Sequence, residues 1–227
     1  MYLITGASRG IGKLLFDNFS NRSETCHGTY NNSLGTEINN LTQVDVRSFN
    51  SVSKWVTGVV DESNSDRIVL INCAGITYNA LGHKSDLDQW KNVIDVNLIG
   101  SFNLIRALLP HMRDANYGRI INFSSVVAQK GVPGTSAYAA SKSGLWGMTK
   151  ALSVENASKN ITINNINLGY FDIGIIDQVP FNSLEGLIET IPVRRLGAPP
   201  NIIKTVDYII DNSDLCGTSI DVNGGLV

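Results

Sequence analysis

The chain has 227 residues, and its 18 basic and 20 acidic side chains give a formal net charge of −2. This balance argues against a nucleic-acid-binding surface, which needs a basic patch. No apolar run approaches the roughly 18 residues of a membrane span, and no basic segment followed by an apolar stretch opens the chain. The three cysteines form no CxxC pair and no cluster with the histidines, so we expect no metal site. We expect one domain over residues 1–227, located in the cytoplasm.

Short apolar runs alternate with longer helical patterns along the chain. Strands are predicted at residues 2–5, 25–30, 41–45, 67–72, 118–124, 161–168 and 219–222, and helices near 11–20, 48–62, 86–114, 136–158 and 199–211. Several of these strands are apolar almost throughout, which is typical of parallel strands covered on both faces. The order predicts a Rossmann-like, doubly wound α/β fold in three layers, α/β/α. In such a fold, ligands bind at the carboxyl ends of the strands.

A glycine-rich turn follows the first predicted strand and precedes a helix. Gly6 permits a tight turn, Gly10 lets the backbone approach a pyrophosphate, and Gly12 lets the helix pack close to the sheet. The helix N-terminus then offers free N–H groups and partial positive charge to an anion. The spacing GxxxGxG, in this position, predicts a cradle for the phosphates of a dinucleotide. Its candidate residues are Gly6, Ser8, Arg9, Gly10, Ile11 and Gly12.

The end of the second predicted strand indicates which dinucleotide is bound. NAD sites commonly place an acid there to bind the ribose 2′-hydroxyl, but residues 27–32 contain none, and Asn31 is the polar candidate. Arg9 could instead meet a 2′-phosphate through charge-assisted hydrogen bonds. The sequence therefore favours NADPH and leaves NADH possible. In the alternative interpretation, Arg9 is only a solvated loop residue and the site accepts both cofactors.

Ser125, Tyr138 and Lys142 form the second candidate site. Tyr138 and Lys142 are four residues apart, so they share one face of a predicted helix. A phenol with a pKa near 10 is a poor acid–base catalyst at pH 7, and a neighbouring ammonium would lower that pKa. Ser125 could hold a substrate oxygen as charge builds on it. Taken singly, Tyr138 and Lys142 would be an ordinary helix aromatic and an ordinary surface charge.

Together these motifs resemble the single-domain short-chain dehydrogenase/reductase family, and the matches run from Thr5 to Gly225. The resemblance implies that Asp45 and Val46 contact the adenine, and that Lys142 binds the nicotinamide ribose as well as tuning Tyr138. It also implies that Asn97 holds a water that relays protons to Lys142; a polar core residue that kinks its helix is the other interpretation. The remaining cofactor contacts implied by the resemblance are Asn72, Ala74, Gly75, Gly169 and Phe171.

The mechanism implied by the resemblance is hydride transfer from a reduced nicotinamide to a carbonyl carbon. Tyr138 would donate the proton and Ser125 would polarise the oxygen, while the protein supplies position and electrostatics. The family commonly forms homotetramers through the two long helices predicted at 86–114 and 136–158. We therefore expect a homotetramer or homodimer, although a monomer stays open.

Three segments, at residues 119–127, 191–197 and 221–225, look most like those of 3-oxoacyl-acyl-carrier-protein reductases. That branch reduces a β-keto thioester with NADPH in fatty acid biosynthesis. The sequence departs from it at Leu168 and Ile173, where the family has a proline and a threonine near the nicotinamide. Of the two basic positions that recognise the carrier protein in that branch, Lys159 keeps one and Asn116 replaces the other.

Residues 170–198 are predicted to form a mobile lid over a small-molecule carbonyl substrate. Their apolar side chains suit an acyl chain or a hydrophobic ketone, or else pack the lid against the domain. They are Tyr170, Phe171, Ile175, Ile176, Val179, Phe181 and Leu184. Two alternative functions are a reductase or dehydrogenase of a sugar, polyol or secondary-metabolite ketone, and a cofactor-binding sensor that lacks catalysis.

Overall fold

The computed structural model describes residues 1–31, 39–63, 65–174, 176 and 181–227, with the side chains of 181–183 left out. All strands lie in one seven-stranded parallel sheet in the order β3-β2-β1-β4-β5-β6-β7. This confirms the predicted Rossmann-like, doubly wound fold. The strands are β1 (Tyr2–Thr5), β2 (Cys26–Tyr30), β3 (Leu41–Gln43), β4 (Val69–Asn72), β5 (Gly118–Ser125), β6 (Ile161–Leu168) and β7 (Ser219–Val222).

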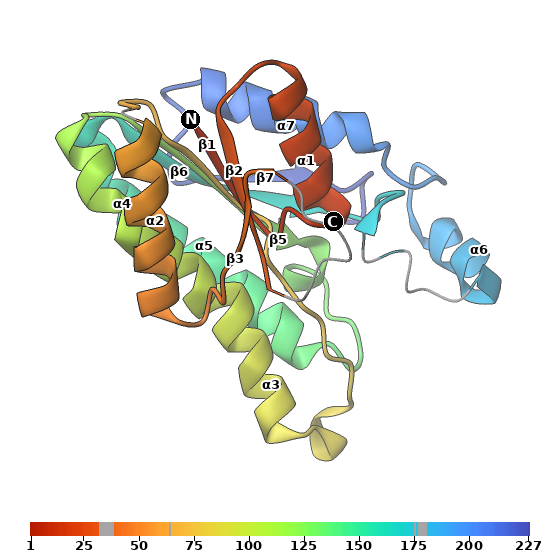
Figure 1. Cartoon of the computed structure of the whole chain (residues 1–227). Coiled ribbons are helices and arrows are strands. Elements are labelled where there is room, and N and C mark those ends of the chain that lie inside the picture. The colour runs from red at the N-terminus through yellow and green to blue at the C-terminus, as the bar shows by residue number, and fades with distance from the viewer. Residues whose placement is uncertain (32–38, 64, 175, 177–180) are drawn as a thin grey trace.

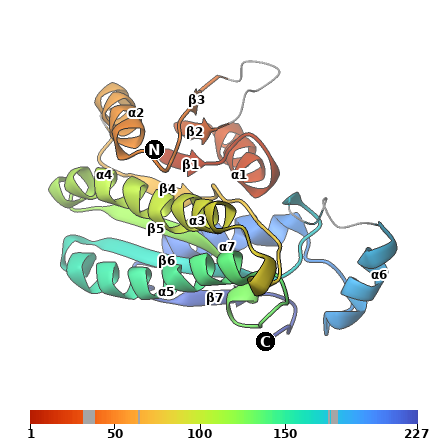
Figure 2. The same cartoon turned by 90° about the horizontal axis from the view of Figure 1, so that it is seen from below.

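Helices cover both faces of the sheet, as Figures 1 and 2 show. One face carries α1 (Gly10–Asn21) and α7 (Pro199–Asp211), and the other carries α2 (Phe49–Ser63), α4 (Gly100–Asp114) and α5 (Ser136–Asn156). Each face has its own apolar cluster: Leu104 and Leu108 belong to the α2/α4 side, and Phe19 and Ile202 belong to the α1/α7 side. The sheet is therefore buried on both faces, as its continuous apolar strands predict.

The two central strands define where the site lies. All eight residues of β5 and all eight of β6 are buried, and the two strands pair in register from Gly118–Ile161 to Ser125–Leu168. Their carboxyl ends therefore meet at one edge of the sheet. Asparagines interrupt the apolar pattern of β6 at Asn164, Asn165 and Asn167, and each makes side-chain hydrogen bonds.

The helix predicted at 86–114 is interrupted. It consists of α3 (Leu87–Ile94), a π-helical turn (Asp95–Ile99) and α4. Such turns often mark functional positions, because they free a backbone group and redirect a side chain. By length and composition alone, Leu87–Asp114 is a helix that could cross a membrane, although the sequence analysis finds no apolar run of that length. Here it packs against α2, α5 and β5 as a core helix.

The predicted lid contains a helix that the sequence analysis does not predict. Phe171 and Gly197 pair in an isolated parallel bridge, so the two ends of the lid segment lie side by side. Within it, α6 (Phe181–Thr190) projects away from the sheet in Figures 1 and 2. Of the predicted lid residues, Ile175, Val179 and the Phe181 side chain lie outside the described part of the chain.

Candidate active site

Ser125 is the last residue of β5, as predicted, and lies at the carboxyl edge of the sheet. Its side chain is nearly buried, at 8% exposure. The Oγ atom accepts a hydrogen bond of 3.2 Å from the backbone N–H of Val127, which opens the next turn. The hydroxyl is thereby fixed at the strand end, where the fold places ligands.

Tyr138 and Lys142 lie on one face of α5, in the first and second turns of the helix. The Lys142 Nζ atom is 5.6 Å from the centroid of the Tyr138 ring. The same atom donates a hydrogen bond of 2.6 Å to the backbone carbonyl of Phe123 in β5. This contact ties α5 to the strand that ends at Ser125, so the structure brings all three predicted residues together.

Burial governs the proton equilibria of both α5 residues. It raises the pKa of Tyr138 to about 12, with a hydrogen bond to Ser125 acting in the opposite direction. It lowers the pKa of Lys142 to about 8, opposed by the nearby Cys73 thiol. The expectation of a lowered phenol pKa is therefore wrong for the protein alone, because removal of the phenolate from water outweighs its favourable contacts.

Asn97 lies in the π-helical turn and is fully buried. Its amide oxygen accepts from the Ile76 N–H at 2.9 Å, and its Nδ2 donates to the Ile76 carbonyl and to Ser141 Oγ, both at 3.0 Å. These bonds join the π turn, the segment after β4 and α5. The predicted water relay to Lys142 stays a prediction, while the kinked-core interpretation describes what these atoms contact.

Gly75 lies close to both Asn97 and Lys142. A Cβ placed on it would be 3.4 Å from Asn97 Oδ1 and 3.7 Å from Lys142 Nζ. The chain at Gly75 therefore lines the same edge of the site as the amide and the amine.

The phosphate cradle has the close approaches that its glycines predict. Gly6 has a φ of +64°, and a Cβ there would be 2.9 Å from the Cα of Ala74. Gly10 has a φ of +55° and lies under Gly174, whose Cα would be 3.2 Å from an added Cβ. At Gly12 a Cβ would be 2.3 Å from the Gly6 carbonyl oxygen. Only glycine fits at these three positions, because a side chain would meet the backbone at each of them.

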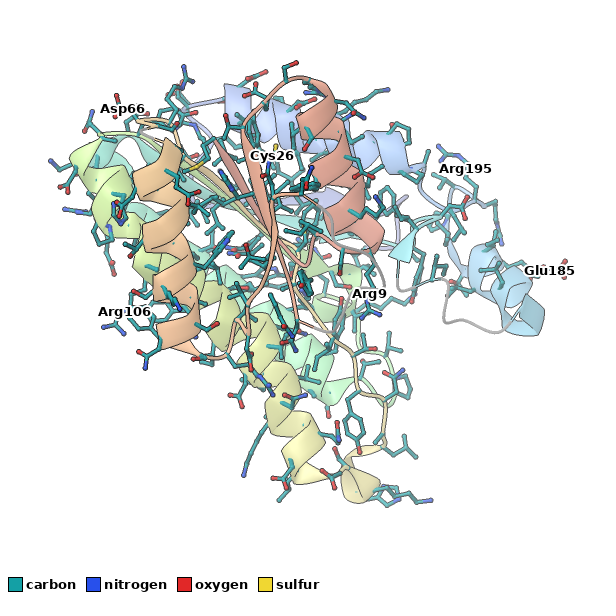
Figure 3. All side chains as sticks on the ribbon, in the orientation of Figure 1. Arg9, Cys26, Asp66, Arg106, Glu185 and Arg195 are labelled. Atoms are coloured by element: carbon teal, nitrogen blue, oxygen red, sulfur yellow. The ribbon has the colours of Figure 1, made fainter. Side chains whose placement is uncertain are left out.

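The N-terminus of α1 adjoins this cradle. Arg9 is the residue before the helix, is exposed, and makes no side-chain cap, and no acid occupies the first turn. Figure 3 shows Arg9 at this end of α1. Ser8 is half-buried beside it, and the Ile11 side chain packs into the apolar cluster below. The open helix end and the arginine suit a phosphate-bearing ligand.

Asp45 has a partner that the sequence patterns do not reveal. Arg47 forms an ion pair of 2.7 Å with it, and the hydrogen bonds from Arg47 lower the pKa of the Asp45 carboxyl. Arg47 also donates to Asn92 Oδ1 in α3. Val46 is buried against Gly100, the first residue of α4. Both predicted adenine contacts therefore lie together in one braced turn after β3.

Asn72 lies at the end of β4, between the cradle and Ser125. Its Nδ2 donates to Asn122 Oδ1 at 2.8 Å, whereas its own buried Oδ1 has no partner among the described residues. Beside it, the Thr5 hydroxyl accepts from the backbone N–H groups of Cys73 and Ala74, both at 3.0 Å. Thr5 thereby joins the ends of β1 and β4, a role that the glycine motif alone does not reveal.

The remaining predicted contacts divide between the site edge and the core. Gly169 follows β6 and lies against Asn223. The Phe171 ring is buried against Gly197, so its side chain packs the lid base, and Ile173 packs into the same apolar cluster. Asn31 is the last described residue before the gap at residues 32–38. Its backbone carbonyl accepts a hydrogen bond from the Gln43 side chain.

The two predicted carrier-recognition positions lie elsewhere. Asn116 and Lys159 are exposed in the turns before β5 and β6, at the opposite end of these strands from Ser125. Neighbouring Asn160 donates to the Asn116 carbonyl, so the two turns are adjacent. Within one chain, the structure therefore does not bring Asn116 and Lys159 close to Ser125. Among the residues that the structure describes, no group of three or more His, Cys, Asp or Glu could hold a metal.

The sheet carries a glycine cradle after β1 and a serine at the end of β5, and a tyrosine and a lysine of α5 lie beside that serine. This arrangement defines an oxidoreductase that uses a nicotinamide dinucleotide. The profile of the short chain dehydrogenase family matches residues 1–180. The chain belongs to the short-chain dehydrogenase/reductase family.

Relatives with reductase names match almost the whole chain. An acetoacetyl-CoA reductase of Shinella zoogloeoides is 37% identical, over 98% of this chain and 96% of that protein. A 3-oxoacyl-acyl-carrier-protein reductase, FabG, of Pseudomonas aeruginosa is 33% identical, over 99% of this chain and 96% of that protein. The ligand-free aldohexose dehydrogenase of Thermoplasma acidophilum has a TM-score of 0.90 at 25% identity, covering 99% of this chain and 92% of its own.

The buried amine of Lys142 predicts a specific pH dependence of stability. The unfolded chain binds a proton at this lysine up to the ordinary pKa of 10.5, and the folded protein only up to a pKa of about 8. Between these values the unfolded state binds more protons, so the amine's destabilising effect shrinks as the pH rises. We expect wild type to gain about 2 kcal/mol over Lys142→Met between pH 7 and pH 9.5, measured by urea unfolding.

The control is Lys150→Met, which removes an exposed lysine from the same helix. Its stability difference from wild type should stay constant over this pH range. An equally flat difference for Lys142→Met would contradict the lowered pKa.

Proposed function

We propose that the protein is an NADPH-dependent carbonyl reductase that converts a 3-oxoacyl thioester to the 3-hydroxyacyl form. The observation that carries this proposal is the meeting of Ser125, Tyr138 and Lys142 at the carboxyl end of β5, next to the glycine cradle. A proton donor, an oxygen-polarising hydroxyl and a buried cation at one strand end suit the reduction of a ketone. When bound, the nicotinamide would supply the hydride.

The residues present fit a dinucleotide. The bare glycine backbone at Gly6 and Gly10, the open N-terminus of α1, and the Asn72 Oδ1 atom, unpartnered within the described residues, line one edge of the sheet. Phosphates would lie over residues 6–12, and the adenine by Asp45 and Val46. The ribose groups would lie against Asn72, Ala74 and Gly75 and against Lys142, with Gly169 and the Phe171 backbone at the nicotinamide end.

The chain's own groups have distinct roles in the proposed reaction. The raised pKa keeps the Tyr138 phenol protonated at neutral pH, as a proton donor to the substrate oxygen requires. Ser125 acts to lower the pKa of this phenol, so its hydroxyl lies beside the proposed proton donor, where one carbonyl oxygen would meet both. Lys142, anchored on the Phe123 carbonyl, holds its amine beside the phenol and favours the charge left on Tyr138 after proton donation.

The thioester substrate is supported by the relatives, whose names specify acetoacetyl-CoA and 3-oxoacyl-acyl-carrier-protein reduction. Both names share the 3-oxoacyl thioester and differ in the carrier. Of the two basic positions that recognise the carrier protein in that branch, Lys159 keeps one and Asn116 removes the other. The departures at Leu168 and Ile173 pack into the apolar cluster at the end of β6. We therefore place the thioester first and leave the carrier to experiment.

A second candidate function is the oxidation or reduction of a sugar, polyol or other small ketone. The likeness to an aldohexose dehydrogenase over nearly the whole chain favours it. The lid decides between the two, because specificity in such folds depends on loops at the carboxyl ends of the strands.

We further propose a homotetramer or homodimer in the cytoplasm. Ile99 and Phe102 in the π turn and α4, and Val154 in α5, are exposed apolar side chains on the two long helices. Val154 is 84% exposed, and a second copy covering these helices would remove that apolar surface from water.

A substrate panel tests the proposed function. Acetoacetyl-CoA, a 3-oxoacyl carrier-protein thioester, aldohexoses and simple ketones are each supplied with NADPH or NADH, and cofactor absorbance is followed. We expect turnover of the thioesters with NADPH. Turnover of sugars or simple ketones alone would support the second candidate, and tight NADPH binding without any turnover would indicate a sensor.

Replacement of Tyr138 by phenylalanine removes the proposed proton donor and keeps the ring. We expect kcat to fall by at least about 100-fold, the scale of general acid catalysis, while the Kd for NADPH changes less than about two-fold. Steady-state kinetics and fluorescence titration measure the two quantities. Tyr208→Phe, which removes a hydroxyl from the exposed tyrosine of α7, is the control. Substantial residual kcat in Tyr138→Phe would refute the assigned role.

Replacement of Arg9 by alanine tests the cofactor preference. Charge-assisted hydrogen bonds contribute about 1.5–3 kcal/mol, so the Kd for NADPH should rise at least about ten-fold while that for NADH stays within about three-fold. Arg22→Ala is matched, because Arg22 lies at the other end of α1 and pairs with Asp207. Equal losses for both cofactors in Arg9→Ala would mean that Arg9 does not contact the 2′-phosphate.

A further inference from the structure

Two rows of polar side chains cross the sheet on its α5 face, just below the catalytic residues. In the first row, Asn72, Asn122, Asn165 and Ser219 are neighbours on β4, β5, β6 and β7. In the second row, Ser124, Asn167 and Asp221 are neighbours on β5, β6 and β7, one step closer to the carboxyl edge. Such groups are costly to bury unless they are hydrogen-bonded, so their contacts indicate what they hold.

Trp146 connects the second row to α5. Its Nε1 donates to Ser124 Oγ and to Asn167 Oδ1, both at 3.0 Å. The Ser124 hydroxyl in turn donates to the backbone carbonyl of Lys142, at 3.0 Å. One indole N–H therefore fixes α5, four residues after Lys142, to the ends of β5 and β6.

The row continues to the turn that follows Ser125. Asn167 Nδ2 donates to Asp221 Oδ1 at 2.7 Å, and Gln129 Nε2 donates to the same oxygen at 2.9 Å. Gln129 ends the short turn over residues 126–128. Ser125 is thus held on both sides, at Ser124 before it and at Gln129 after it, by one hydrogen-bonded chain.

We propose that Trp146 is a positioning residue that sets the distance between Ser125 on β5 and the Tyr138–Lys142 face of α5, through the chain Ser124–Trp146–Asn167–Asp221–Gln129. Ser124 and Asn167 are 3% and 1% exposed, so their bonds are protected from water. Loss of the indole donor leaves both acceptors without that bond and removes one of the links that hold α5 to β5 and β6. A displacement of the hydroxyls by about 1 Å is enough to slow catalysis strongly.

The chain supplies a matched comparison in Trp55 of α2. Trp55 is 6% exposed, and its buried Nε1 has no hydrogen-bond partner in the part of the chain that the structure describes. Trp55→Phe therefore removes an indole N–H from the core without breaking a hydrogen bond among the described residues. Trp146→Phe removes an indole N–H that makes two. The difference between the variants isolates the hydrogen bonds from the loss of ring size.

The proposal rests on the proposed reductase function, and kinetics test it first. With the best substrate of the panel, Trp146→Phe should lower kcat at least about five-fold and leave the Kd for NADPH within about two-fold. Trp55→Phe should leave both within about two-fold of wild type. Equal kcat values in wild type and Trp146→Phe would overturn the positioning role.

A second measurement needs neither substrate nor cofactor. The backbone N–H of Val127 donates to Ser125 Oγ, so its hydrogen exchange, followed by NMR, reports how firmly the serine is held. Exchange at Val127 should be at least about five-fold faster in Trp146→Phe than in wild type or Trp55→Phe. Unchanged exchange would overturn the proposal. A wild type without turnover on any substrate would reject the proposed function and leave this test intact.

A compensating pair guards against a fold defect in Trp146→Phe. Asn167→Asp places a second carboxylate against Asp221 and should lower kcat and speed Val127 exchange. Adding Asp221→Asn restores a donor–acceptor pair between β6 and β7 and should recover at least half of both losses. A double variant no better than Asn167→Asp alone would contradict a role for this chain in holding Ser125.

Discussion

The 2.6 Å hydrogen bond from Lys142 Nζ to the Phe123 carbonyl determines how α5 meets the end of β5. It requires an amine to be buried in a sheet interior, where water cannot solvate it, and the lowered pKa of Lys142 is the consequence. The contact also leaves the amine beside the Tyr138 ring. The same atom therefore connects the fold to the proposed chemistry, because α5 cannot shift on the sheet without moving both residues away from Ser125.

Polar groups in the sheet interior support this contact. Asn97 joins the π turn to Ser141, next to Lys142, and Trp146 joins the next turn of α5 to Ser124 and Asn167. Thr149, one turn further, bonds Asn122 and Asn165. Successive turns of one helix are thus fixed to the π turn and to two strands, β5 and β6, by directional bonds. Apolar packing alone would leave such a helix free to slide, whereas buried hydrogen bonds penalise any displacement.

The sequence predicts the fold well wherever local pattern and tertiary role agree. β6 and α7 begin and end as expected, because β-branched residues in β6 and a proline at the start of α7 are local signals. The sequence offers a kink at Asn97 only as one of two interpretations, since the π turn depends on contacts with Ile76 and Ser141. The helix α6 is missed although Leu184, Leu187 and Ile188 recur at helical spacing, because residues 170–198 are interpreted as a lid. For the site, the residue types are visible in the motifs. The raised pKa of Tyr138, the Arg47 partner of Asp45 and the Trp146 connection depend on burial and on residues distant in the sequence.

The central claim is that this site reduces a ketone by direct hydride transfer while Tyr138 supplies the proton. The most direct test supplies acetoacetyl-CoA with NADPH deuterated at one or the other face of the nicotinamide C4, in ordinary water. We expect one deuterium at the new hydroxyl-bearing carbon from one cofactor epimer and none from the other, detected by mass spectrometry. A product without deuterium from either epimer, or deuterium at that carbon only when the reaction runs in D2O, would contradict the claim.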